Sequence, residues 1–272
     1  MQILITNDDG IAAPGLWHLV DAVKHLGDIT VVAPDRDCSG VGPSLTMHGP
    51  MRVDKHASPI SGVTAYAVNG TPGDTAILGI GEVMDQRPDI VLSGHNAGNN
   101  VARDVLLSGT IGAALHGFRN GVASIALSLH LVDEGYDQVI KERTAQIVQE
   151  VVESGVMSLL NVNFPVLDPS ACGLHDHSAE TVGLAGAKNA VLAPPRMVDS
   201  IVRDDRVSRT FYWNNRTALP LETDKMPADC DLALLRKHMV TVTELTDSLG
   251  ESEPSAETQT LISNLDAKIR SN

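Results

Sequence analysis

The chain has 272 residues, of which 43% are hydrophobic and 20% are charged, as is typical of globular proteins and not of disordered ones. Its 20 Lys and Arg residues against 34 Asp and Glu residues give a formal net charge of −14, which excludes a general surface for nucleic acids or anionic membranes. Three widely spaced cysteines without a CxxC pair exclude a disulfide framework and a thiolate zinc site.

The first residues, MQILITNDDG, have no basic and apolar signal pattern, so we expect no secretory signal. No stretch reaches the roughly 18 consecutive apolar residues of a transmembrane helix. The sequence therefore predicts a cytoplasmic protein with no membrane partner.

Short apolar runs alternate with helical patterns over residues 1–166. We expect strands at 3–6, 29–33, 63–68, 90–92, 124–129 and 160–164, and helices at 16–26, 74–83, 110–118 and about 136–152. Apolar strands that alternate with helices indicate a mostly parallel sheet with helices on both faces. The predicted fold is therefore α/β, with a Rossmann-like core at 1–166.

The pattern weakens over residues 167–272, which we interpret as a C-terminal extension. A late strand is expected near Val240 and Val242, and a final helix after Ser255 with apolar side chains on one face. Residues 211–213 form an aromatic triplet that indicates packing within the subunit or across an oligomer contact, ligand stacking being the alternative.

Polar residues follow each of the first four predicted strands, at 7–10, 35–40, 69–73 and 93–100, and a further polar turn opens a helix at 108–110. In open parallel sheets, ligands bind beyond the carboxyl ends of the strands. These loops therefore predict one binding site along a single edge of the sheet.

Asp8 and Asp9 are adjacent carboxylates at a strand end, and bringing them together is costly unless a cation neutralises them. With the Ser39 hydroxyl and the Asn96 amide they form an all-oxygen set, which suits Mg²⁺, Mn²⁺ or Ca²⁺ better than zinc. The alternative is that Asp8 and Asp9 only cap the helix that follows them.

Ser108, Gly109 and Thr110 offer backbone N–H groups and two hydroxyls at a helix N-terminus, where a phosphate can bind. The alternative for Ser108 is an ordinary helix cap. Asn99 and Asn100 either orient the phosphate or support the turn. His95 adjoins the predicted site and is a possible substrate contact, as is Asn100.

Other catalytic patterns are absent from the sequence, which contains no GxxxxGK[ST], HExxH or GxSxG motif. Cys38 lies near the predicted site, but no phosphate-binding loop of a thiol phosphatase follows it. These absences disfavour a P-loop NTPase, a zinc protease, a serine hydrolase and a thiol phosphatase.

Six sequence blocks occur in order along residues 1–165: MxILxTNDDG at 1–10, APDR with SG and SLT within 33–46, NGTPxD at 69–74, SGxNxGxN at 93–100, SGTxGAA at 108–114 and LNVNxP at 160–165. Together they resemble the SurE (survival protein E) family of nucleotidases. The chain departs from that family's usual residues at Leu107, His116, His95, 230–231 and 237–238.

The resemblance implies a metal-dependent phosphatase that releases phosphate from nucleoside 5′-monophosphates, with 3′-monophosphates and short polyphosphate as further substrates to consider. It implies one Mg²⁺ or Mn²⁺ ion per subunit, held by Asp8, Asp9, Ser39 and Asn96. It also implies a homodimer or homotetramer in which the C-terminal extension exchanges elements between subunits.

We expect Asn96 and residues 108–110 to hold the phosphate, while a water activated by the cation or by Asp8 or Asp9 attacks in line. Two other interpretations remain open. One is a phosphatase in which Asp8 itself is phosphorylated, although such enzymes normally use Asp-x-Asp spacing. The other is a nucleotide sensor that binds without hydrolysis.

Overall fold

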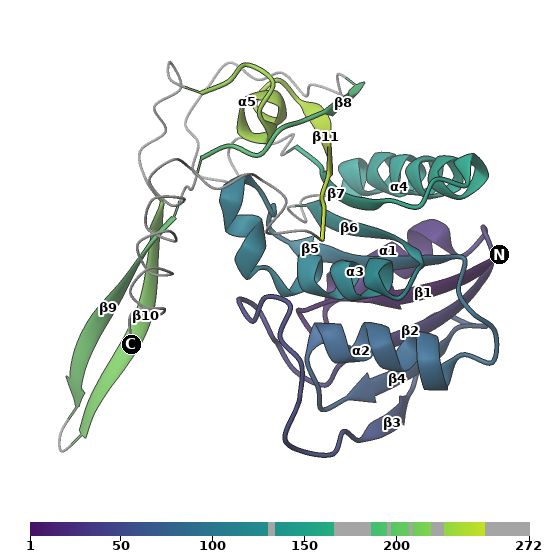
Figure 1. The fold of residues 1–272 in the computed structure, drawn as a ribbon, viewed down its shortest axis with the longest axis horizontal. Coiled ribbons are helices and arrows are strands. Elements are labelled where there is room, and N and C mark those ends of the chain that lie inside the picture. The colour runs from purple at the N-terminus through teal and green to yellow at the C-terminus, as the bar shows by residue number, and fades with distance from the viewer. Residues whose placement is uncertain (130–133, 166–185, 195–196, 207–208, 219–225, 248–272) are drawn as a thin grey trace, which may run out of the picture.

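A computed structural model describes residues 1–129, 134–165, 186–194, 197–206, 209–218 and 226–247 (Figure 1). In these ranges one sheet has the strand order β3-β4-β2-β1-β5-β6-β7-β11-β8. Its strands are β1 (Gln2–Thr6), β2 (Asp28–Pro34), β3 (Val53–His56), β4 (Thr64–Val68), β5 (Ile90–Ala97), β6 (Ala123–Leu129), β7 (Leu159–Asn163), β8 (Gly186–Asn189) and β11 (Met239–Glu244).

The six strands from β4 to β7 are all parallel to one another. β3 pairs antiparallel with β4 at one edge, and β11 pairs antiparallel with β7 toward the other. The chain begins in the middle of the sheet at β1, continues to β2, and later returns to β5 on the other side of β1. The topological switch point, where ligands bind in such sheets, therefore lies between β1 and β5.

Helices cover both faces of the sheet, as Figure 1 shows. The side chains of α1 (Pro14–Val23) and α4 (Glu134–Ser154) pack on one face, against Ile3 and Ile5. The opposite face packs against α2 (Pro72–Leu78), the π-helical turn η1 (Gly79–Val83) and α3 (Gly109–Arg119).

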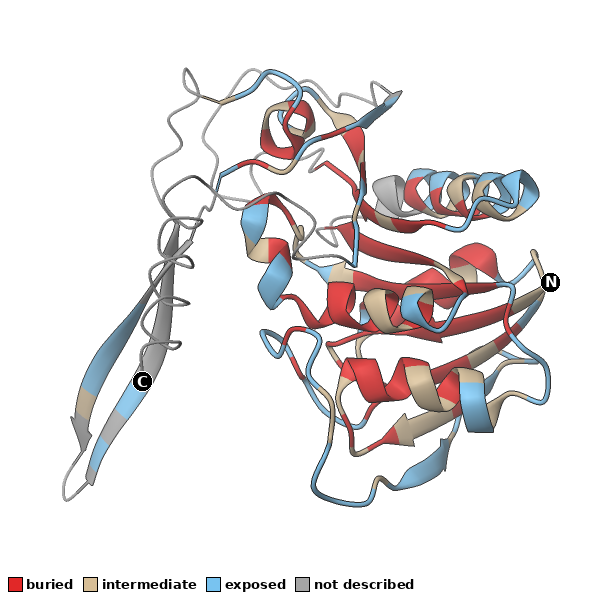
Figure 2. Ribbon diagram, viewed as in Figure 1, coloured by how far each residue is buried: buried red, intermediate tan, exposed pale blue. Residues whose placement is uncertain are grey.

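The central strands are buried along most of their length (Figure 2). Ile3, Leu4 and Ile5 of β1 are all 0% exposed, because successive side chains enter the two helix-covered faces in turn. This explains why β1 appears in the sequence as an unbroken apolar run. The predicted α/β fold with a mostly parallel sheet is confirmed.

β5 is longer than the sequence indicates, because it continues to Ala97 where we predicted a loop from Ser93 onward. Its extra residues stay paired with β6, after a register shift between Ser93 and Asn96. Gly94 permits this path, since an added Cβ would lie 2.2 Å from the carbonyl oxygen of Leu127 and its φ is +139°. Polar residues thus form the end of a buried strand.

The C-terminal part contributes to the same sheet through β8 and β11. The strand expected near Val240 and Val242 is confirmed as β11, whereas β3, β8 and the short α5 (Asp231–Leu235) were not predicted. Strands on both sides of the predicted boundary at residue 166 thus belong to one sheet, and the division into a core and an extension stays a prediction. The predicted final helix and its cap Ser255 lie outside the described residues.

A separate antiparallel hairpin consists of β9 (Met197–Arg206) and β10 (Arg209–Ala218). It projects away from the sheet in Figure 1 and carries the predicted aromatic triplet. Tyr212 is 65% exposed, so its ring is not covered by the described part of the chain. None of the described helices is both long and apolar enough to cross a membrane.

Candidate metal and phosphate site

The loop after β1 is shaped by Asn7, whose side chain bonds both the N–H and the carbonyl oxygen of Gly10. α1 begins only at Pro14, with Ala13 at its N-cap position and no side-chain cap. Asp8 and Asp9 are therefore not helix caps, and the structural alternative for these two carboxylates is wrong.

A pocket of about 300 Å³ opens at the carboxyl ends of β1 and β5, and it holds the four predicted metal ligands. Its size is at the lower end of the range of small-molecule sites. The lining residues are Asp8, Asp9, Ser39, Gly40, Asn96, Ala97, Asn99, Asn100, Val101, Asp104, Leu107 and Ser108. The structure thus brings the four predicted ligands to one pocket, and their binding of a cation stays a prediction.

Asp8 is only 3% exposed. Its burial, together with the nearby Asp9 charge, raises its pKa to about 6, although a 2.7 Å hydrogen bond donated by the Thr110 hydroxyl opposes the rise. Burial also raises the pKa of Asp9, against the effect of the Ala97 N–H that donates to it at 3.3 Å. Among the described residues, no positive charge lowers the pKa of either carboxylate.

Ser39 and Asn96 present neutral oxygens to the same pocket. The Ser39 hydroxyl donates to the Asp37 carboxylate at 2.6 Å, so its oxygen lone pairs remain for another partner. The Asn96 Nδ2 donates to the carbonyl of Gly98 at 2.7 Å, which leaves the amide Oδ1 as an acceptor. Each side chain is therefore oriented by one bond and keeps an oxygen for a ligand.

These donors fit a hard divalent cation. Two desolvated carboxylates, a hydroxyl and an amide oxygen match the ligand preference of Mg²⁺ and Mn²⁺, and a bound cation would offset the cost of burying Asp8 beside Asp9. Within the described ranges no three His, Cys, Asp or Glu side chains gather as a metal-binding group. Any cation here would thus depend on this mixed oxygen set and on water.

Only Ser108 of the residues 108–110 reaches the pocket. Its Oγ accepts the N–H of Ile111 at 3.2 Å, so it is also the N-cap of α3. Gly109 and Thr110 are buried behind Asp8, and a Cβ at Gly109 would lie 2.7 Å from the Cβ of Asp8. The predicted phosphate contact through the Thr110 hydroxyl is wrong, because that side chain is 0% exposed.

His95 is not the substrate contact that its sequence position suggested. It is 0% exposed on the face of the sheet covered by α1 and α4. Its ring nitrogens bond His18 at 2.8 Å and Thr144 at 3.1 Å. Because β5 continues through this residue, its side chain enters the core beside Phe164 instead of the pocket.

Asn100 lines the pocket, but both of its amide hydrogens are bonded to Thr110 and Ser128. Asn99 lines it as well. Sequence reasoning missed two further lining residues, Val101 and Asp104. Asp104 lies in the 3-10 helix η2 (Ala102–Leu107), which precedes α3, and Val101 lies at the start of η2. The sequence does show that Asp104 is an acidic residue four positions before Ser108. The segment around it has no clear periodicity, so its position could not be predicted.

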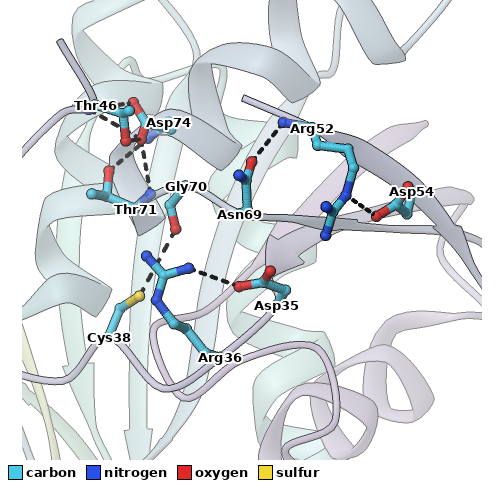
Figure 3. A network of polar contacts seen from close by, with 10 residues as sticks. All are labelled: Asp35, Arg36, Cys38, Thr46, Arg52, Asp54, Asn69, Gly70, Thr71 and Asp74. Carbon is cyan, nitrogen blue, oxygen red and sulfur yellow. Dashed lines mark hydrogen bonds and ion pairs between the residues drawn. The ribbon is translucent and has the colours of Figure 1, made fainter. Parts of the chain in front are cut away.

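Figure 3 shows a polar network that connects the loops after β2 and β4, next to the pocket. The carboxylate of Asp74 accepts hydrogen bonds from the backbone and hydroxyl of Thr46, and it forms a capping box with Thr71 at the start of α2. The thiol of Cys38 points to the carbonyl of Gly70 at 3.8 Å, and burial raises its pKa. A buried thiol with a raised pKa is a poor nucleophile, which also disfavours a thiol phosphatase.

Comparisons with known proteins converge on one family. The family model described as Survival protein SurE matches residues 3–185. A 5′-nucleotidase SurE of Methanocella arvoryzae is 36% identical over 279 residues, covering 96% of this chain and 97% of that protein. One from Dehalococcoides mccartyi is 42% identical over 253 residues, covering 92% and 90%. The solved SurE protein from Aquifex aeolicus has a TM-score of 0.73 and 28% identity, covering 98% of this chain and all of that one.

Proposed function

The chain belongs to the SurE family, and on that premise we propose that it is a divalent-cation-dependent phosphatase of the cytoplasm that hydrolyses nucleoside 5′-monophosphates to nucleoside and phosphate. The similar proteins from Methanocella arvoryzae and Dehalococcoides mccartyi are both described as 5′-nucleotidases. Nucleoside 3′-monophosphates and short polyphosphate are further candidate substrates.

The convergence of four oxygen donors from three separate strand ends carries this proposal. Asp8 and Asp9 follow β1, Ser39 follows β2, and Asn96 lies at the end of β5, yet all four line one pocket. They would hold one Mg²⁺ or Mn²⁺ ion. The bound ion would supply positive charge to a phosphoryl oxygen and to the attacking water.

The residues of the chain position the other reactants. The Asn96 and Asn99 amides and the Ser108 hydroxyl line the pocket and can donate hydrogen bonds to phosphoryl oxygens. Asp9 is less buried than Asp8, which makes it the more accessible of the two candidate bases for the water proton. Val101 and Leu107 provide apolar surface at the same pocket, where a nucleoside can pack.

The test is a phosphate-release screen over the 5′- and 3′-monophosphates of the common nucleosides and short polyphosphate. It is run with Mn²⁺, with Mg²⁺ and with excess EDTA. We expect release from 5′-monophosphates that stops with EDTA and returns with added metal. Nucleotide binding without release in either metal would contradict the proposal and support a nucleotide sensor. Isolation of a phosphoenzyme would instead support a phosphorylated aspartate.

We also propose a homodimer or homotetramer in which the hairpin β9–β10 contacts a second copy. A two-stranded hairpin alone is only marginally stable, and this one exposes Ile201, Val202 and Tyr212. Replacing residues 199–216 by a short flexible linker should lower the molar mass in light scattering to that of the monomer. An unchanged molar mass would contradict this role of the hairpin.

A further inference from the structure

We propose that Thr110 and Asn100 are positioning residues that orient Asp8 for cation binding, through a hydrogen-bond relay anchored by Asn161 and Asn163 of β7. This inference rests on the proposed function, because it takes Asp8 as a cation ligand. It assigns roles to three buried polar side chains, Thr110, Asn161 and Asn163, that do not line the pocket.

The bonds of the relay run from Asn100 through Thr110 to Asp8. The Asn100 Nδ2 can only donate, and it gives one hydrogen to Thr110 Oγ1 at 3.2 Å and the other to Ser128 Oγ at 2.9 Å. The hydroxyl hydrogen of Thr110 is therefore directed to Asp8 Oδ1, at 2.7 Å. This bond engages one carboxylate oxygen and leaves Oδ2 for a cation.

The position of Asn100 is itself held from the adjacent strand. Asn161 Nδ2 and Asn163 Nδ2 both donate to the carbonyl oxygen of Asn100, at 2.8 and 2.9 Å. Both asparagines are 0% exposed, and they lie two residues apart on the same face of β7. Two buried amides thus fix a single backbone carbonyl at the rim of the pocket.

The two asparagines of β7 use only their amide nitrogens, which indicates that they are there to hold the carbonyl of Asn100. Among the residues that the structure describes, the buried Oδ1 atoms of Asn161 and Asn163 have no hydrogen-bond partner, because turning either amide would place its oxygen against the carbonyl of Asn100. Buried polar atoms in native proteins are nearly always paired, and an unpaired one calls for an explanation.

The relay also explains why Thr110 lies behind Asp8. Partners that hydrogen-bond a metal ligand fix its orientation, and their removal weakens metal binding by about 10–100-fold in other proteins. Gly109 lies against the same carboxylate, with the site of a Cβ only 3.0 Å from Asp8 Oδ2. Asp8 is thus confined by a glycine on one side and by a fixed hydrogen-bond donor on the other.

The test measures the Mn²⁺ dissociation constant of the full-length protein without substrate, by electron paramagnetic resonance of the free ion, together with the melting temperature of the metal-free protein. Thr110→Val removes the hydroxyl at constant shape, and Thr110→Ser restores it. Thr243→Val is the matched control, since Thr243 is a buried β11 threonine whose hydroxyl has no hydrogen-bond partner among the described residues. Asp8→Asn tests the cation site itself.

We expect Thr110→Val to raise the Mn²⁺ dissociation constant about tenfold or more, while Thr110→Ser and Thr243→Val stay close to the wild type. If Thr110→Val does not fold, Asn163→Leu should give a smaller increase in the same direction. Asp8→Asn should abolish Mn²⁺ binding. If it does, and the Mn²⁺ dissociation constant of Thr110→Val is unchanged, the relay is overturned. The same holds for Asn163→Leu where Thr110→Val does not fold. An unchanged constant in Asp8→Asn would overturn the proposed cation site.

Discussion

Two regions of the molecule support the same pocket in different ways. The first is the edge of the sheet formed by β1, β2 and β5, and the second is the group of C-terminal elements β8, β11 and α5. The first region supplies the proposed cation ligands directly, from residues next to buried strand ends. The second region touches the pocket loop through Asp231, whose carboxylate accepts the N–H of Ala102 at 2.7 Å and that of Ala193 at 3.1 Å. Chemistry is therefore local to the strand ends, whereas the shape of the pocket depends on residues more than a hundred positions away.

Asp8→Asn gives the largest expected effect, because it removes charge from the reactive edge without changing its shape. Phosphate release should fall about a hundredfold or more. The metal-free variant should be at least as stable as the wild type at pH 7, since burial raises the pKa of Asp8 to about 6 and the ionised form is the disfavoured one. Phosphate assays and thermal melts measure both.

Asp35→Asn is the control for that change, as Asp35 is an exposed carboxylate on the same edge and does not line the pocket. Its activity should match the wild type. If Asp8→Asn releases phosphate about as fast as Asp35→Asn, the proposed role of Asp8 is contradicted.

Gly109→Ala should have the next largest effect. The added Cβ would meet Asp8 Cβ at 2.7 Å and the carbonyl oxygen of Cys38 at 3.2 Å, so Asp8 must shift. Overpacking of this kind costs about 1–3 kcal/mol, and we expect roughly tenfold slower phosphate release. Gly81→Ala, where the Cβ meets nothing within 4 Å, should keep full activity. Equal activities in the two variants would contradict this account of Asp8.

Asp231→Asn tests the remote support of the pocket. The buried carboxylate of Asp231 accepts hydrogen bonds from two backbone N–H groups, and in the variant an amide nitrogen would face one of them. We expect the free energy of unfolding to fall by about 1–3 kcal/mol in urea titrations, with a smaller loss of activity than in Asp8→Asn. The exposed neighbour change Asp229→Asn should be neutral. If both variants are equally stable, the C-terminal region does not support the pocket through this carboxylate.

The smallest expected effect lies far from the pocket, where Asp21 of α1 bonds Lys141 of α4 at 2.8 Å and Lys24 at 2.7 Å. These bonds lower its pKa to about 2, so its contribution to stability is present above the unfolded value near 3.8 and is lost as the pH falls toward 2. The side chain is 35% exposed, so the contribution is under about 1 kcal/mol.

Asp21→Asn should therefore be slightly less stable than the wild type at pH 6, with the difference shrinking from pH 4 downward and in 0.5 M salt. Urea titrations at each pH measure this. A difference that grows on acidification would contradict the sign of the pKa change.

The sequence predicted the reactive edge better than the rest because its signals are local. An apolar run followed by Asp8 and Asp9 indicates both a buried strand and the loop at its end. His95 was misplaced because β5 continues as a paired strand through residues that look like a loop, which only the neighbouring strand β6 determines. Thr110 was misjudged as a phosphate contact, and the support of the pocket by Asp231 was missed. In both cases the hydrogen-bond partner lies far away in the chain.

The most direct test of the central claim is the anomalous-scattering map of a crystal of this protein grown with Mn²⁺. One peak should lie within coordination distance of the Asp8 and Asp9 carboxylates, the Ser39 hydroxyl and the Asn96 Oδ1. A peak elsewhere, or no peak in this pocket while phosphate release still requires Mn²⁺, would contradict the account.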